Sequence, residues 1–103
     1  MIELLEQHRK DVGKLCWEYG VSRLDVFGSA ADGTFEAAHS DIDFLVEFRP
    51  ETTMGPWLSR FTSFQGALEK LLGRRVDLVM PQAMRNPYFI REVNRTRVTL
   101  YAA

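Results

Sequence analysis

Hydrophobic residues recur along the chain with two different spacings. Between residues 2 and 19, and again between residues 57 and 72, they recur every three or four positions, which is typical of amphipathic helices. Gly20 and Gly73 follow these stretches directly, as a glycine often follows a helix end. The apolar stripes expected to face the core are Leu5, His8, Val12, Leu15, Cys16 and Tyr19 in the first helix, and Trp57, Phe61, Phe64, Leu68, Leu71 and Leu72 in the second.

Some residues of these helices have a more specific interpretation. Thr52 or Thr53 is placed to cap the second helix, with Pro56 in its first turn. In the first helix, Cys16 is interpreted as a buried structural thiol. His8 is interpreted as a packed histidine, and not as a ligand or a catalytic group, because it lies on the apolar stripe.

Shorter apolar stretches predict strands. Residues 24–27 form a brief apolar run that is too short for a helix. Residues 41–48 alternate between apolar and mostly polar positions, which predicts a strand with one face in the core, ended by Pro50. Residues 75–80 alternate in the same way, and residues 97–101 are a candidate for a last short strand.

The connecting segments complete the predicted architecture. Residues 30–40 are small and polar, with a turn expected at Gly33. Pro81 is expected to open a helical segment that Asn86-Pro87 breaks or kinks before a second turn reaches Val93. We therefore predict a single domain, residues 1–103, of the α/β or α+β class, built on a small mixed β-sheet with helices packed on one side of it.

Composition and charge narrow the classes of function. The chain has 103 residues, of which 46% are hydrophobic and 26% are charged, as in ordinary soluble globular domains. A net charge of -1 argues against direct binding to a nucleic-acid backbone. The single cysteine cannot form an internal disulfide, and no segment has the roughly 20 apolar residues of a membrane span or the apolar core of a signal peptide. We expect a cytoplasmic protein without a membrane partner.

Three acidic residues form a candidate site. Asp41 and Asp43 are two positions apart on one strand, so they share a face and lie about 6.6 to 6.8 Å apart along the backbone. Asp77 lies on another predicted strand, opposite that strand's apolar residues. If the two strands are neighbours, one carboxylate must take up a proton or a hard cation such as Mg²⁺ must neutralise the cluster. The solvated face of a strand shows the same D-x-D pattern, so both interpretations stay open at this point.

A glycine and a serine supply the second part of the candidate site. Gly28-Ser29 follows the short apolar run directly. A glycine allows the backbone to approach a ligand closely, and a hydroxyl with free N–H groups can hold a phosphate. A phosphate cradle combined with carboxylates and a divalent cation indicates transfer to or from a nucleoside triphosphate.

The order of these pieces resembles a known family. Val26-Phe27-Gly28-Ser29, followed after eleven residues by Asp41-Ile42-Asp43, is similar to the signature of the polymerase-beta-type nucleotidyltransferase fold. The short chain, the 75–79 strand and the Pro81 segment resemble the minimal nucleotidyltransferases (MNT), many of which are antitoxins encoded beside a HEPN-domain toxin.

This resemblance implies a role for each motif residue. Gly28 and Ser29 would contact the triphosphate, and Asp41 and Asp43 would hold Mg²⁺. Asp77 would complete the metal site and help to deprotonate the acceptor hydroxyl, so the three aspartates are the expected catalytic residues. The implied reaction transfers AMP from ATP to a tyrosine of the HEPN toxin.

The sequence departs from the family pattern at two points. Family members commonly carry an arginine at the position of Asp32, and the spacer before Asp41 is slightly longer than usual. An acid at this position repels a triphosphate, unless Arg23, Arg74 or Arg75 takes over the role of the arginine. Three functional alternatives follow: an active nucleotidyltransferase, a module of the same fold that neutralises its partner by occlusion, or a domain whose acids serve solubility only. Exposed aromatics such as Trp57 or Tyr88 are candidates for an interface.

Overall fold

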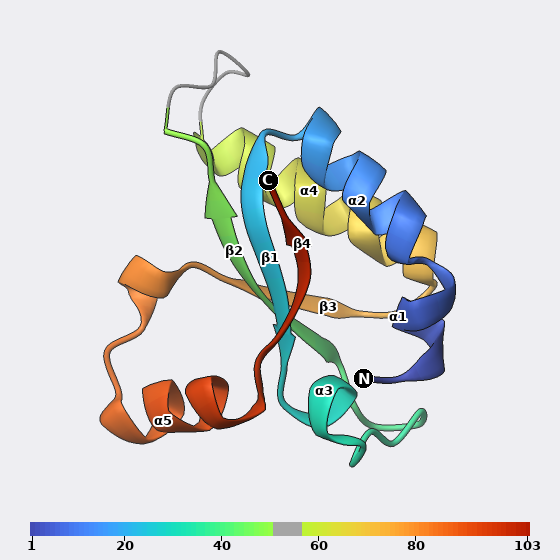
Figure 1. Ribbon diagram of the computed structural model, residues 1–103, viewed down its shortest axis with the longest axis vertical. Helices are drawn as coiled ribbons and strands as arrows, with labels where there is room; N and C mark the ends of the chain where they lie inside the picture. Colours follow the sequence, from blue (N-terminus) through green and yellow to red (C-terminus); the bar gives the residue numbers. More distant parts are fainter. Residues whose placement is uncertain (51–56) are drawn as a thin grey trace.

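The computed structural model describes residues 1–50 and 57–103. The proposed cap at Thr52 or Thr53 and the first-turn Pro56 therefore lie outside the described residues. Figure 1 shows the arrangement of the elements. In chain order they are α1 (Glu3–Gln7), α2 (Arg9–Glu18), β1 (Val21–Phe27), α3 (Ser29–Asp32), β2 (Ile42–Phe48), α4 (Trp57–Leu72), β3 (Val76–Val79), the 3-10 helix η1 (Pro81–Ala83), α5 (Pro87–Thr96) and β4 (Val98–Ala102).

Among the described residues, four strands form one sheet in the order β3-β2-β1-β4. β1 pairs antiparallel with both β2 and β4, whereas β2 and β3 run parallel. A parallel pair needs a long crossover connection, and α4 lies in the connection between β2 and β3. The predicted mixed sheet is confirmed.

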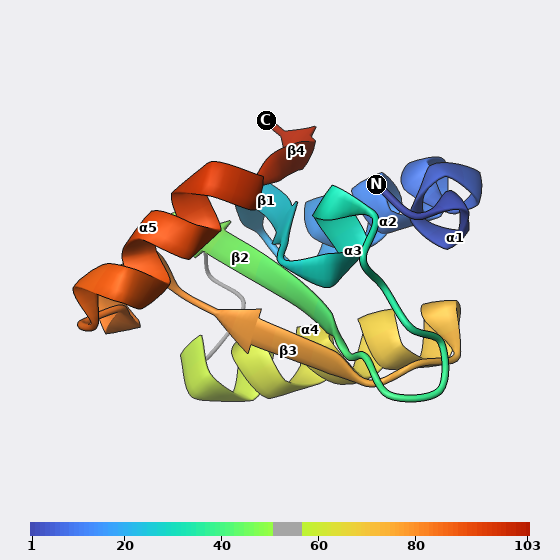
Figure 2. The same ribbon diagram turned by 90° about the horizontal axis from the view of Figure 1, so that it is seen from below.

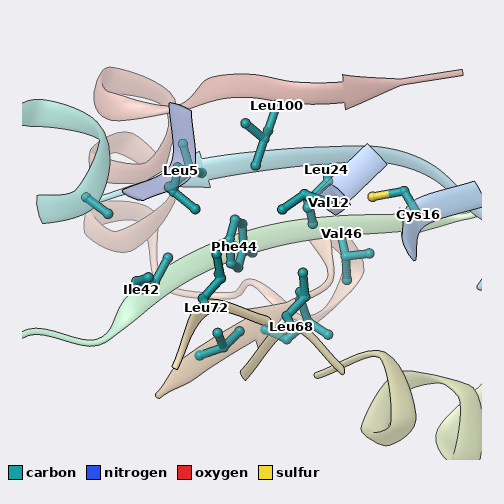
Figure 3. Packing of buried hydrophobic residues seen from close by; sticks show 14 of the residues in the cluster. Leu5, Val12, Cys16, Leu24, Ile42, Phe44, Val46, Leu68, Leu72 and Leu100 are labelled. Carbon is teal, nitrogen blue, oxygen red and sulfur yellow. The ribbon is translucent and has the colours of Figure 1, made fainter. Parts of the chain in front are cut away.

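The alternation seen in β2 separates the two faces of the sheet. One face packs against α2 and α4 and carries the main core, which Figure 3 shows from close by. Phe44 of β2 and Phe64 of α4 are fully buried there, beside Cys16 of α2. Further buried members of this core are Leu5, Val12, Leu24, Ile42, Val46, Leu68, Leu72 and Leu100. Both predicted apolar stripes are thus core-facing wherever their side chains are described.

The other face of the sheet is covered in part by α5, so the expectation that helices pack on one side only is wrong. Figure 2 shows α4 on one side of β2 and β3 and α5 on the other. Phe27, Leu45 and Val93 form a second small cluster between the sheet and α5. Phe89 of α5 meets the Phe27 ring edge-on, with 5.8 Å between the ring centroids. Leu45, an apolar residue on the polar face of β2, is the sequence signal for this second layer.

Several boundaries differ from the sequence prediction. The first helix is interrupted at His8, whose Nδ1 lies 2.9 Å from the carbonyl oxygen of Leu4, so this histidine is structural as expected. β1 begins at Val21, three residues earlier than predicted, because its antiparallel pairing with β2 extends that far. Ser29–Asp32 is a single helical turn inside the segment expected to be loop. The predicted turn at Gly33 is confirmed, with φ at +88°.

The C-terminal helix also begins differently. Pro81 opens a 3-10 turn and not an α-helix, since an extended stretch follows it. The predicted break at Asn86-Pro87 is confirmed, because the residues between η1 and α5 are extended. Pro87 then begins α5, since its fixed φ suits the first helical position. The Asn86 side chain caps α5 by accepting the N–H of Tyr88 at 2.9 Å. None of the helices within residues 1–50 and 57–103 combines the length and the apolar composition that crossing a membrane requires.

Candidate active site

Gly28 lies at the point where β1 ends and α3 begins. Its φ of +70° is a left-handed conformation that glycine adopts without strain. The preceding residue, Phe27, is paired with Asp43 of β2. A Cβ placed on Gly28 would approach the Asp43 Oδ2 atom to 2.9 Å, so the absence of a side chain at position 28 leaves room for the Asp43 carboxylate. The structure thus brings the Gly-Ser motif and the D-x-D motif together at one end of β1 and β2.

Asp77 joins the same place from β3. Asp43 and Asp77 are direct partners in the parallel pairing of β2 and β3, and Asp41 immediately precedes β2. Burial, together with the charges of Asp77 and Asp41, raises the pKa of Asp43 to about 6. Asp41 and Asp77 therefore lie close enough to Asp43 for their charges to disfavour its ionised form.

The carboxylates at this end of the sheet are suitable ligands for a metal ion. In the described part of the chain, no three His, Cys, Asp or Glu side chains are grouped tightly enough to hold an ion on their own. Mg²⁺ does not need such a group, because it is usually bound by one or two carboxylates together with substrate phosphates and water. Asp41 and Asp43 supply hard oxygen donors, and a cation beside them would offset the burial of Asp43 and its repulsion by Asp77 and Asp41, which together raise its pKa. The residues fit a Mg²⁺ ion that arrives with a triphosphate.

The candidate phosphate-binding part of the site is the turn from Gly28 into α3, which we call the phosphate turn. The N–H groups of Ala31 and Asp32 both donate to the Gly28 carbonyl, at 3.0 and 3.1 Å, which closes this turn. Ser29, the first residue of α3, is partly exposed. The Gly28 N–H is not free, because it donates to Thr96 Oγ1 of α5 at 2.9 Å. No local sequence pattern indicated Thr96, which is 68 residues away from Gly28 in the chain.

The arginines proposed to replace the missing family arginine are mostly engaged elsewhere. Arg23 pairs with Asp25, with 3.1 Å between Nε and Oδ1. Arg74 donates to the Ala37 carbonyl and lies over the Phe35 ring. Arg75 is held next to β2 by its backbone, since its carbonyl accepts the N–H of Ile42 at 3.0 Å.

A different arginine lies next to Asp32, the position at which family members commonly carry an arginine. Arg95 of α5 lies 3.8 Å from the Asp32 carboxylate, and it also hydrogen bonds to Glu92 of its own helix. Hydrogen bonds from the hydroxyl and N–H of Thr34 hold the pKa of Asp32 below its usual value, and Arg95 contributes in the same direction. Asp32 is therefore an ionised residue with a cation beside it. Sequence reasoning missed Arg95 because the contact depends on where α5 ends.

Asp25 is a buried acid that sequence reasoning also missed. Its side chain is 1% exposed, and it lies on β1 in the same alternation as Phe27. Arg97, directly after α5, donates from Nε to Asp25 Oδ2 at 2.7 Å. The acid within the apolar run Leu24–Phe27 was the available signal. Its two arginine partners identify Asp25 as a structural ion pair that ties the end of α5 to β1.

Comparison with known proteins agrees with this geometry. The pattern of the nucleotidyltransferase domain family matches residues 7–99. The protein adenylyltransferase MntA of Thermococcus cleftensis is 36% identical over 83 residues, which cover 81% of this chain and 76% of that protein. A solved structure provisionally described as a minimal nucleotidyltransferase is 35% identical and superposes with a TM-score of 0.74, covering 94% of this chain and 95% of that chain.

A third comparison extends the likeness of fold. A chain from the Shewanella oneidensis complex between an MNT antitoxin and a tri-AMPylated HEPN toxin superposes with a TM-score of 0.64. It is 18% identical, and the match covers 96% of this chain and 73% of that chain. The family match spans nearly the whole chain and includes the Gly28-Ser29, Asp41, Asp43 and Asp77 positions. The chain therefore belongs to the nucleotidyltransferase domain family, as one of its minimal members.

Proposed function

We propose that this nucleotidyltransferase transfers AMP from ATP to a hydroxyl group of a HEPN-type toxin, in a Mg²⁺-dependent reaction, and thereby acts as its antitoxin in the cytoplasm. The observation that carries the proposal is the pairing of Asp43 with Asp77 directly beside Gly28. This arrangement places two carboxylates and a side-chain-free backbone turn at one point. It suits a reaction in which a triphosphate, a cation and an acceptor hydroxyl must meet.

Each residue has a defined task in this reaction. Gly28 and Ser29 bind the triphosphate, while Asp41 and Asp43 hold the Mg²⁺ that accompanies it. The acceptor oxygen attacks the α-phosphorus of ATP, a new P–O bond forms, and the bond to pyrophosphate breaks. Asp77 accepts the proton of the acceptor hydroxyl. Bound Mg²⁺ would stabilise the charge that develops on the phosphate oxygens.

Chemistry and the relatives support a proposal for the acceptor. The Thermococcus relative is named as a protein adenylyltransferase, and the Shewanella complex contains a HEPN toxin that carries AMP. Among protein hydroxyls, we propose a tyrosine, because a phenol with a pKa near 10 is far more easily deprotonated by a carboxylate than an aliphatic alcohol. AMP attached to the toxin would add negative charge close to the site where the toxin acts on RNA.

One observation favours a second function. Asp32 stands where the family commonly carries an arginine, and its carboxylate is ionised beside the phosphate turn. A chain that binds ATP weakly for this reason would still have the fold and could neutralise its partner by covering it. In this alternative, the aspartates are dispensable for protection against the toxin.

The decisive experiment combines the purified protein, the candidate HEPN toxin, Mg²⁺ and ATP labelled on its α-phosphate. We expect label on the toxin, and loss of labelling when Asp41→Asn and Asp43→Asn are combined. Asp11→Asn, which neutralises an exposed acid on α2, is the matched control and should label normally. If the double variant still protects cells fully against the toxin, occlusion is the correct account.

Ligand binding can be tested before the partner is in hand. A ligand that binds only the folded state raises the midpoint of thermal unfolding, by an amount set by its concentration relative to Kd. We expect a larger rise with Mg²⁺ and ATP together than with Mg²⁺ alone. An unchanged midpoint at millimolar concentrations of both would contradict the proposed activity.

A further inference from the structure

The end of α5 is hydrogen bonded to the phosphate turn. The residue that makes this bond, Thr96, lies outside the Gly-Ser and D-x-D motifs. Thr96, the last residue of α5, is 7% exposed, and its hydroxyl makes two hydrogen bonds. Oγ1 accepts the N–H of Gly28 at 2.9 Å and donates to the carbonyl of Glu92 at 3.0 Å. Figures 1 and 2 show the end of α5 beside the junction of β1 and α3. The hydroxyl therefore links the helix backbone to the motif glycine.

The attachment is held in place by the next residue. Arg97 donates to the buried Asp25 carboxylate of β1 at 2.7 Å. Thr96 is thus hydrogen bonded to Gly28, directly after β1, and the next residue, Arg97, is bonded to Asp25 within β1. Because both contacts involve buried atoms, the position of Gly28 depends on the position of the last turn of α5.

The last turn of α5 also places a positive charge, Arg95, beside the phosphate turn. Arg95 lies 3.8 Å from Asp32, the residue in the place of the family arginine, and its side chain is 60% exposed. Glu92 accepts hydrogen bonds from Arg95 Nε at 3.1 and 3.2 Å and from one terminal nitrogen. A guanidinium has five N–H donors, so donors remain for a further anion. The cation that α3 lacks is thus supplied by α5.

We propose that the last turn of α5 forms part of the triphosphate subsite, with Thr96 as a positioning residue for Gly28 and Arg95 as a phosphate-binding residue. This inference rests on the proposed function. Thr96 fixes the left-handed turn that brings the backbone to the nucleotide. Arg95 compensates for Asp32 and turns toward the triphosphate when the nucleotide binds.

Thr96→Val tests the positioning role because valine keeps the shape and removes the hydroxyl. We expect the KM for ATP and the Kd for Mg²⁺ with inorganic tripolyphosphate to rise about tenfold, whereas kcat at saturating ATP changes by less than about threefold. Thr96→Ser keeps the hydroxyl and should restore both constants. The matched control is Thr62→Val in α4, which removes a hydroxyl that donates to the Leu58 carbonyl at 3.1 Å, away from Gly28.

Arg95→Gln tests the charge. We expect tripolyphosphate binding to weaken about tenfold and its dependence on salt concentration to become shallower, because one cation no longer contacts the anion. Asp32→Asn should tighten binding in the protein that retains Arg95, since it removes a competing anion. Asp32→Asn is also made in the Arg95→Gln variant. If it changes the Kd for tripolyphosphate equally with and without Arg95, the two residues act independently, and the inference that Arg95 compensates for Asp32 is overturned.

The outcomes separate this inference from the proposed function. If the unaltered protein transfers AMP but Thr96→Val keeps normal ATP and tripolyphosphate constants, the positioning role is wrong and the proposed function stands. Failure of Thr96→Ser to restore binding would also overturn it. If Arg95→Gln leaves the Kd and the salt dependence unchanged, Arg95 does not bind phosphate. If the unaltered protein binds no ATP, the proposed function and the inference are both wrong.

Discussion

Asp43 of β2 and Asp77 of β3 are direct partners in the parallel register of the two strands. Like charges at directly paired positions destabilise a sheet, because the side chains leave the same face at neighbouring points. Burial raises the pKa of Asp43 to about 6, and Asp77 and Asp41 contribute in the same direction. In the protein without a bound cation, this site therefore lowers the stability of the fold at neutral pH.

Asp43→Asn should stabilise the metal-free protein at pH 7. The folded-state pKa of Asp43 is raised above that of the unfolded chain, so protonation favours the folded state. This contribution is complete below about pH 4 and is lost as the pH rises through about 6. We expect Asn to raise the free energy of unfolding at pH 7 by about 1 to 2 kcal/mol, allowing for partial exposure of the side chain. Urea unfolding between pH 4 and 8 measures the difference.

The pH profile separates this effect from general charge removal. Asp43→Asn should flatten the fall in stability between pH 4 and pH 6, whereas Asp11→Asn on the exposed face of α2 should keep the profile of the unaltered protein. A destabilised Asn variant at pH 7 would mean that the carboxylate makes favourable contacts that outweigh its repulsion by Asp77.

Gly28→Ala should impair nucleotide binding more than it impairs folding. The added Cβ would lie 2.9 Å from Asp43 Oδ2, and this carboxylate can rotate away. Moving it costs little stability but takes an oxygen from the position where Mg²⁺ is proposed to bind. We expect at least a tenfold loss in kcat/KM for AMP transfer, together with about 1 kcal/mol of destabilisation from the positive φ.

Gly33→Ala is the matched control for this experiment. Gly33 also has a positive φ, at +88°, but a Cβ added to it would meet no other atom within 4 Å. Gly33→Ala should lose about as much stability as Gly28→Ala, but its transfer activity should stay close to that of the unaltered protein. Equal losses of activity in the two variants would attribute the effect to backbone strain and not to displacement of Asp43.

The acidic motifs of the candidate site were predictable because they follow strand periodicity. The alternation from Asp41 to Phe48 fixes which side of β2 faces the core, and so it places Asp41 and Asp43 on one side. Asp77 joined them through the same alternation in β3, once β2 and β3 were neighbours. The mixed sheet and the core stripes of α2 and α4 follow from the same patterns.

The contribution of α5 to the candidate site was not predictable in the same way. Thr96 and Arg95 reach the phosphate turn only because α5 continues to residue 96 and packs on the face opposite α4. That packing depends on Phe27 and Leu45. Leu45, apolar on the polar face of β2, indicates that this face is covered, but it does not indicate which helix covers it. The short helix α3 was missed because a single turn has no periodicity to detect.

Cys16 should be unreactive in the folded protein. The side chain is fully buried, and burial raises the pKa of its thiol to about 12, so the thiolate that reacts with disulfides is scarce. We expect labelling by a thiol-specific disulfide reagent at pH 8 to be limited by unfolding. The labelling rate should therefore rise with urea in step with the unfolded fraction. Rapid labelling in the absence of urea would show that the helix carrying Cys16 opens locally.

Asp25→Asn should be among the most destabilising single changes on β1. Burial tends to raise the pKa of Asp25, but hydrogen bonds from Arg23, Arg97 and Thr99 together hold it below its usual value. The stabilisation is therefore present above the pKa of the unfolded chain, near 3.9, and is lost as the pH falls through the lower folded-state pKa.

Removing this charge leaves Arg97 and Arg23 without their shared anion. We expect a loss of about 1 to 3 kcal/mol at pH 7, since the buried partner of both ion pairs is removed while the two arginines stay partly exposed. Glu6→Gln breaks the exposed pair with Arg9 and should cost less than about 0.5 kcal/mol. Because Arg97 adjoins Thr96, Asp25→Asn should also weaken ATP binding in the molecules that remain folded. A stable variant with normal ATP affinity would show that the end of α5 does not depend on its bond to β1.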